Sequence, residues 1–100
     1  MRLKFEIYND KDECAGYMLL EAYPEELHIV WINVHETERG KGFGSKLIEL
    51  AKSYAKLKGL SRITGFVDTS AEGYIQRKRF FERFGKLTFS NRALSFIILP

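Results

Sequence analysis

Residues 39–44 read Arg-Gly-Lys-Gly-Phe-Gly, between an apolar run at 28–34 and an amphipathic segment that begins at Ser45. A glycine-rich turn that opens a helix can direct several backbone N–H groups at one point, where the helix dipole favours negative charge. Glycine suits this role because a Cβ atom would keep a phosphate away from the main chain. The pattern predicts a diphosphate site at the start of a helix. The alternative is a tight turn without a ligand, which needs fewer glycines.

Candidate proton-transfer groups flank the apolar run. His28 opens the run, and Glu26 shares its strand face if the strand extends that far. An imidazole titrates near neutrality and can serve as a general base. A partly exposed histidine at a strand end is an equally good interpretation. His35 and Glu36, just after the run, are second-rank candidates.

The sequence shows no pattern of a covalent nucleophile or of a metal site. Cys14 is the single cysteine, so an intrachain disulfide is impossible and no Cys/His cluster has zinc spacing. No Ser/His/Asp or Cys/His set stands out, which argues against a covalent intermediate. We therefore expect no metal.

Basic residues are concentrated in one short stretch. They are Arg77, Lys78, Arg79 and Arg83. One interpretation is a solvated helix face, and the other is an anionic partner, either a nucleotide phosphate or an acidic macromolecule. A net charge of +3 without a recognised motif does not favour a nucleic-acid binder.

Three strands are predicted before the glycine segment: Arg2–Tyr8, Ala15–Ala22 and Leu27–Val34. The first alternates apolar and polar residues, and short turns join all three, which indicates an antiparallel meander. The third is almost continuously apolar. This pattern predicts that both of its faces are covered.

The hydrophobic period changes after the glycine segment. A helix is predicted from Ser45 to Lys58, ending at Gly59, and a strand from Ser61 to Val67. A helix between two strands implies a right-handed crossover, so this strand should lie parallel to the third and beside it.

The remaining elements are a helix and a hairpin. Thr69–Glu72 fits a capping box ahead of a helix at Ile75–Phe84. Strands at Lys86–Ser90 and Ala93–Leu99 close around Asn91-Arg92. The predicted order is β-β-β-α-β-α-β-β, in a single α/β domain over residues 1–100.

Targeting signals are not evident. No segment approaches the ~20 apolar residues of a membrane span, and the N-terminus alternates charged and apolar residues instead of forming a signal-peptide block. We expect a cytoplasmic protein without membrane association.

The element order, with Arg39-x-x-Gly42-x-Gly44 after the third strand, resembles the GNAT superfamily of acyl-CoA-dependent N-acyltransferases. The family signature is Gln/Arg-x-x-Gly-x-Gly/Ala, and the segment 34–47 matches it. The last helix of the family often reads Asn-x-x-Ala-x-x-Phe-Tyr-x-x-x-Gly-Phe. In the corresponding segment here, Phe80 and Gly85 match, whereas four positions differ: Tyr74, Arg77, Phe81 and Lys86.

The resemblance implies a mixed α/β sheet in a minimal form, without the usual N-terminal strand and two helices. It implies acetyl-CoA as co-substrate, held in a slot where the third strand splays from the next. The pantetheine arm would pair with the backbone of Ile32, Asn33 and Val34. The pyrophosphate would meet the N–H groups of Arg39, Gly40, Lys41, Gly42, Phe43, Gly44 and Ser45.

The resemblance also suggests catalytic roles. Many members carry a glutamate general base at the position of His28, so His28 or Glu26 would assist amine deprotonation. Members commonly have a tyrosine proton donor where this chain has Phe81. Tyr74 is the substitute candidate, or else a packing aromatic. An N–H in 33–34 would meet the oxyanion.

The resemblance favours an N-acetyltransferase that transfers acetyl directly to a primary amine. An open acceptor side suits a protein lysine or N-terminus better than a small metabolite, and a homodimer is another way to close the groove. The alternative is a non-catalytic acyl-CoA-binding or protein-interaction module of the same fold.

Overall fold

The computed structural model describes residues 1–70, 72–90 and 93–100. The elements are β1 (Arg2–Tyr8), β2 (Cys14–Ala22), β3 (Glu26–Val34), η1 (Glu36–Glu38), α1 (Phe43–Leu57), β4 (Arg62–Val67), α2 (Tyr74–Glu82), β5 (Lys86–Ser90) and β6 (Ala93–Ile98). The predicted order is confirmed, with boundaries within two residues and the short 3-10 helix η1 in addition. Position 71 of the predicted capping box and the predicted turn at 91–92 lie outside the described residues.

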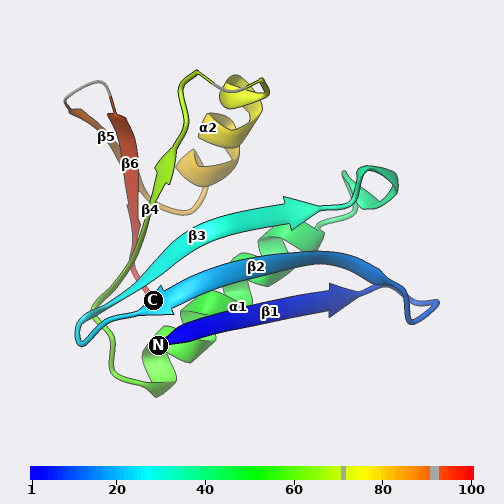
Figure 1. The fold of residues 1–100 in the computed structure, drawn as a ribbon, viewed down its shortest axis with the longest axis horizontal. Coiled ribbons are helices and arrows are strands. Elements are labelled where there is room, and N and C mark those ends of the chain that lie inside the picture. Colours follow the sequence, from blue (N-terminus) through cyan, green and yellow to red (C-terminus); the bar gives the residue numbers. More distant parts are fainter. Residues whose placement is uncertain (71, 91–92) are drawn as a thin grey trace.

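The strands form one mixed six-stranded sheet in the order β1-β2-β3-β4-β6-β5 (Figure 1). β3 and β4 pair in parallel, and the other neighbours pair antiparallel. The predicted crossover through α1 is therefore confirmed. None of the helices in the described ranges is long and apolar enough to cross a membrane.

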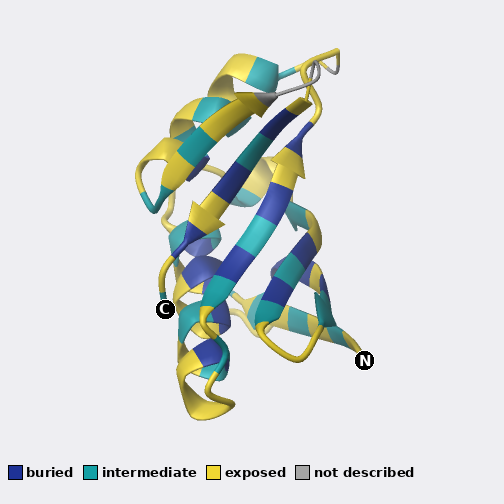
Figure 2. Cartoon of the chain, turned by 90° about the vertical axis from the view of Figure 1, so that its left-hand side faces the viewer, coloured by how far each residue is buried: buried dark blue, intermediate teal, exposed yellow. Residues whose placement is uncertain are grey.

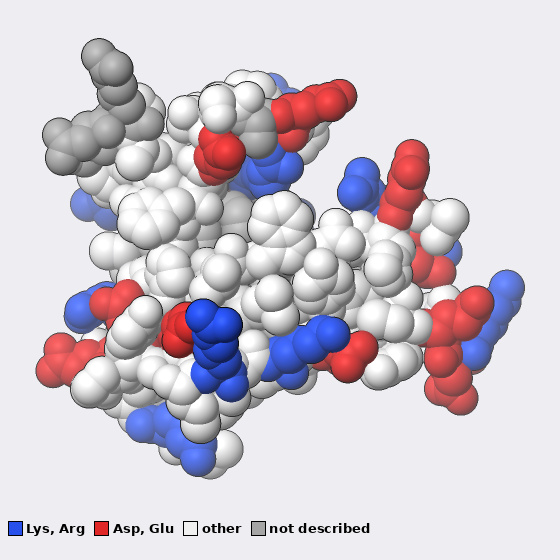
Figure 3. Space-filling model, in the orientation of Figure 1, with Lys and Arg blue, Asp and Glu red and all other residues white. Residues whose placement is uncertain are grey.

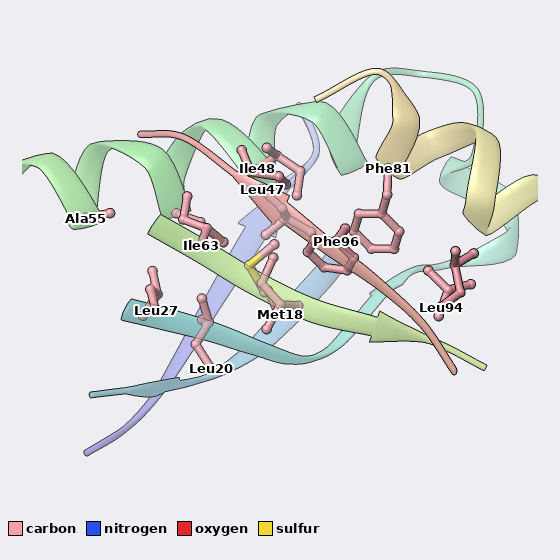
Figure 4. Close-up of a cluster of buried hydrophobic side chains, with 14 residues drawn as sticks. Met18, Leu20, Leu27, Leu47, Ile48, Ala55, Ile63, Phe81, Leu94 and Phe96 are labelled. Carbon is pink, nitrogen blue, oxygen red and sulfur yellow. The ribbon is translucent and has the colours of Figure 1, made fainter. Parts of the chain in front are cut away.

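Both helices pack on the same face of the sheet, and the core lies between them and the strands (Figure 4). The buried residues of α1 recur at helical spacing: Phe43, Leu47, Ile48, Ala51 and Ala55. α2 contributes Phe81, whose ring stacks on Phe96 of β6 with centroids 4.1 Å apart. Alternate residues of the strands supply the other side of this core, as the banding in Figure 2 shows.

The expectation that both faces of the third strand are covered is wrong. Val30 and Trp31 are 54% and 55% exposed. Both helices lie on one face, and a β-bulge at Val30 shifts the register between β2 and β3. The uncovered side, here called the helix-free face, carries the side chains of Leu19, His28, Trp31, Thr64, Phe66 and Ile97.

β3 and β4 separate part-way along their length. Their parallel register runs from Glu26 opposite Arg62 to Ile29 opposite Gly65 and then stops. Beyond this point the edge of β3 has no partner in β4, and the two ribbons diverge in Figure 1. This is the splay that the family resemblance implied.

Candidate acyl-CoA site

The glycine turn leaves backbone donors free at the start of α1. Gly42 precedes the helix with φ 86° and ψ 9°, a conformation that glycine adopts without strain. The first helical hydrogen bond runs from the Lys46 N–H to the Gly42 carbonyl at 3.1 Å. Among the described residues, the N–H groups of 40–45 form no hydrogen bond. They are therefore available to an anion.

A cleft with a volume of about 620 Å³, here called the main cleft, lies beside this turn. Its lining residues are Ile32, Asn33, Val34, Arg39, Gly44, Glu72, Gly73, Gln76, Arg77, Phe80 and Phe81. The first five were predicted to bind the cofactor. Those at 72–81 were not, because only the packing of α2 on β4 and β5, beside the start of α1, brings them to the cleft.

The edge of β3 presents unpaired backbone groups to the cleft side. The His35 N–H donates to the Ala15 carbonyl at 2.8 Å, which sets the phase of the ladder between β2 and β3. Because directions alternate along a strand, the N–H and C=O of Ile32 and Val34 point away from β2. Arg39 Nε donates to the Val34 carbonyl at 3.1 Å. The resemblance implied that the N–H of Asn33 or Val34 would meet the oxyanion. The Asn33 N–H points toward β2, so only the Val34 N–H faces the splay.

The side chains of Lys41 and Phe43 lie outside the main cleft. Phe43 is 8% exposed and lies beneath Lys46 Nζ, 5.2 Å from the ring centroid. Lys41 Nζ pairs with Glu38 at 3.2 Å. Hydrogen bonds from Asn9 and then from Lys41 lower the pKa of Glu38. These groups line a second, polar cleft of about 360 Å³, so Lys41 and Phe43 can offer the main cleft only their backbone.

The basic stretch of α2 divides into two sets. Arg77 lines the main cleft, and an Arg83 Nη donates to Ser45 Oγ at 3.3 Å, beside the glycine turn. Lys78 instead forms an ion pair with Glu82 on the exposed helix surface. The anionic-ligand interpretation therefore fits Arg77 and Arg83, and the solvated-helix interpretation fits Lys78.

Aromatic residues of α2 close one wall of the main cleft. A Cβ atom at Gly44 would lie 3.0 Å from Phe80 Cε1, so glycine allows α1 and α2 to approach closely there. Phe81 also lines the cleft but is only 3% exposed. Tyr74 is partly buried against the core and is not among the cleft-lining residues. Its contacts are those of a packing residue.

The predicted base candidates lie on the helix-free face, just before β3 and β4 separate. His28 Nδ1 is 3.0 Å from Thr64 Oγ1, and Thr64 Oγ1 donates to Glu26 Oε2 at 2.5 Å. Arg62 donates to Glu26 Oε1 at 3.3 Å. The bond from Thr64 and then the contact with Arg62 lower the pKa of Glu26. Thr64 could not be predicted from the sequence, because its contact with His28 depends on the register between two strands that are distant in sequence.

Within the described ranges, no group of three or more His, Cys, Asp or Glu side chains is placed to hold a metal ion.

The sequence of residues 3–86 matches the family described as acetyltransferase (GNAT) family. The chain belongs to the GNAT family. Its fold agrees with that of other GNAT structures, although no curated protein matches the chain significantly in sequence.

Three solved structures illustrate the likeness to the GNAT fold. The PaiA N-acetyltransferase from Thermoplasma acidophilum, in complex with coenzyme A, is 13% identical with a TM-score of 0.82, over 99% of this chain and 61% of that one. The IAA acetyltransferase from Bacillus cereus is 19% identical with a TM-score of 0.77, and the match covers 99% of this chain and 78% of that one. GCN5 from Tetrahymena is 15% identical with a TM-score of 0.67, and the match covers 99% of this chain and 69% of that one. At these identities the likeness concerns the fold.

Proposed function

We propose that this GNAT protein is an acetyl-CoA-dependent N-acetyltransferase that acetylates a primary amine directly. One observation carries the proposal: the free N–H groups at the start of α1 adjoin the same cleft as the unpaired edge of β3. Coenzyme A has a pyrophosphate that suits the first and an amide-rich arm that suits the second. The coenzyme A complex of the PaiA relative supports this assignment.

The residues present fit such a ligand. Arg39 and Arg77 line the cleft beside the helix N-terminus, so the site combines two guanidinium groups with uncommitted N–H donors. The N–H and C=O of Ile32 point toward the splay and could pair with an amide. Acetyl-CoA would supply the acetyl thioester.

The chemistry requires a neutral amine and a proton acceptor. The amine nitrogen would form the new C–N bond as the C–S bond breaks, and sulfur would leave as the thiolate. The amine proton would pass to His28 or to Glu26. Cys14 Sγ lies 3.5 Å from the Gly16 carbonyl and is not among the cleft-lining residues, which supports direct transfer without an acyl-cysteine.

The acceptor is proposed to be a protein lysine or N-terminus. Trp31, Phe66 and Ile97 on the helix-free face are 55%, 67% and 46% exposed. None of the described residues covers this face, whereas a small amine needs walls that bury most of its surface. A protein acceptor brings its own surface and could dock there.

Phe81 favours a second candidate, a non-catalytic acyl-CoA-binding or protein-interaction module. Its side chain has no hydroxyl to reprotonate a thiolate and packs into the core against Phe96. Such a module would bind coenzyme A with the same main-chain groups and would transfer no acetyl group.

Binding is tested by thermal unfolding with and without acetyl-CoA. Gly42→Val should abolish the stabilisation because a β-branched residue strains a position at φ 86° and narrows the approach to the turn. Gly59→Val is the matched control. It lies after the other end of α1 at φ 70°, so it should lower the unfolding temperature but retain the ligand shift. Equal shifts in both variants would place the ligand elsewhere.

Catalysis is tested by mass spectrometry of reactions with lysine-containing proteins and with a panel of small amines. The proposal expects a mass increase of one acetyl group on proteins, with greater kcat/KM than for any small amine. Efficient turnover of a polyamine or aminoglycoside with no protein acetylated would contradict the proposed acceptor. Binding without any transfer would favour the non-catalytic module.

A further inference from the structure

Three side chains from two strands form a hydrogen-bonded chain on the helix-free face. His28 lies opposite Thr64 in the parallel register, and Glu26 precedes His28 by two residues on the same face. The chain runs from His28 Nδ1 to Thr64 Oγ1 at 3.0 Å and from there to Glu26 Oε2 at 2.5 Å. The ring of Phe66 meets the imidazole edge-on, with centroids 5.6 Å apart. The imidazole is thus held on two sides.

The direction of each hydrogen bond follows from the number of protons available. A threonine hydroxyl has one proton to donate, and an ionised carboxylate can only accept. The lowered pKa of Glu26 keeps it ionised at neutral pH, so the proton of Thr64 is directed to Glu26. Thr64 Oγ1 must then accept from His28, which requires that His28 Nδ1 carry a proton.

We propose that Thr64 is a positioning residue that holds His28 as the Nδ1–H tautomer and leaves the Nε2 lone pair to accept the amine proton. This role rests on the proposed acetyltransferase function. When Nε2 takes up the proton, Nδ1 keeps its own, and both hydrogen bonds of the chain persist. The imidazolium then lies two hydrogen bonds from the carboxylate of Glu26, which stabilises its positive charge.

The other charged groups around His28 are already paired. Glu21 lies opposite His28 on β2, and its carboxylate accepts from Arg2 Nε at 2.8 Å. Arg62 on β4 forms an ion pair with Glu26, with an Nη of Arg62 3.3 Å from Glu26 Oε1. Glu26 is thus the acidic group that the hydrogen bonds connect to His28, through the Thr64 hydroxyl.

The tautomer is measured by nitrogen NMR of the imidazole rings in the purified chain, above the titration of histidine. The unmodified protein should show Nδ1–H for His28. Thr64→Val should shift His28 toward Nε2–H, the tautomer that free imidazole side chains favour in water, and Thr64→Ser should restore Nδ1–H. His35, the other histidine of the chain, is the internal control and should not change. An Nε2–H signal in the unmodified protein, or no change in Thr64→Val, would overturn the proposal.

A second test measures the dependence of kcat on pH. Thr64→Val should lower kcat near neutral pH about tenfold, with recovery at higher pH as free amine becomes abundant and with an unchanged KM for acetyl-CoA. Thr64→Ser should retain the profile of the unmodified enzyme. A Thr64→Val profile that matches the unmodified one would overturn the positioning role. If no amine is acetylated, the proposed function fails, and the NMR result still decides whether Thr64 sets the tautomer.

Discussion

Glu26 is a partly exposed carboxylate whose pKa is lowered by Thr64 and Arg62. A carboxylate with a lowered pKa stabilises the folded state above its unfolded-state pKa, and this contribution is lost as the pH falls through the folded-state pKa. Glu26→Gln should therefore lower the free energy of unfolding by about 0.5–1 kcal/mol at pH 7. The difference should begin to decrease as the pH falls below the ordinary value of 4.5 and should vanish below the lowered folded-state pKa.

Urea unfolding at neutral and acidic pH measures this difference. Glu25→Gln, on the exposed neighbouring residue, is the control and should change stability little at either pH. A Glu26→Gln effect of the same size at both pH values would show that packing, and not charge, is responsible.

The family resemblance aligns Phe81 with a position where members commonly have a tyrosine, and Phe81 lines the main cleft. If reprotonation of the thiolate limits the rate, Phe81→Tyr should raise kcat about tenfold with KM for acetyl-CoA unchanged. Steady-state kinetics across the pH range tests this. Phe84→Tyr, just beyond α2 and away from the cleft lining, should have no effect. An unchanged kcat in Phe81→Tyr would mean that solvent supplies the proton fast enough.

At the scale of elements, a ring on the neighbouring strand lies over the last β4 residue that pairs with β3. A Cβ atom at Gly65 would lie 2.3 Å from Phe96 Cζ, so the ring occupies the space of a side chain. Gly65 is also the last β4 residue paired with β3. The packing of Phe96 over this position therefore adjoins the point where the splay begins.

Gly65→Ala should lower the free energy of unfolding by about 1–3 kcal/mol because the ring must move. Denaturant unfolding of Gly65→Ala, Phe96→Leu and the double variant measures the coupling. The double variant should lose less than the sum of the single losses, since the smaller side chain makes room for the methyl group. Ser95→Ala, on the other face of β6, serves as the control. Additive losses would contradict the steric account.

At the scale of the whole molecule, the helices cover one face of the sheet and leave the other open. Figure 3 shows the helix-free face, whose middle is uncharged, with Lys, Arg, Asp and Glu mainly toward its margins. The exposed apolar side chains of this face are Leu19, Trp31, Phe66 and Ile97. A surface of this kind marks a candidate docking site.

Trp31 is the single tryptophan of the chain and reports on this face directly. Its side chain should be strongly quenched by acrylamide in the isolated protein because it is 55% exposed. A lysine-containing acceptor protein should lower the quenching constant at least about twofold, since an interface core excludes solvent. Equal quenching with and without the acceptor would contradict docking on this face. Quenching that increases on dilution would instead indicate a dimer through the same face.

The sequence by itself determined the local features. The alternation of apolar residues in β1 and the helical spacing in α1 reflect periods of 2.0 and 3.6 residues, which are visible within each segment. The glycines at 40, 42 and 44 also predicted the turn locally, because the backbone conformation of a short segment depends mainly on its own residues. The order of the elements then limited the topology to the observed crossover.

Only the tertiary structure decided which distant residues meet. Thr64 reaches His28 across 36 positions of sequence, and this contact depends on the register of two strands that α1 separates. Arg77 enters the main cleft because α2 packs on β4 and β5 and so lies beside the start of α1, not because of any pattern within α2. The exposure of Trp31 follows from the placement of both helices on the opposite face. Such features arise from contacts between segments, and the periodicity within a single segment contains no information about its partner.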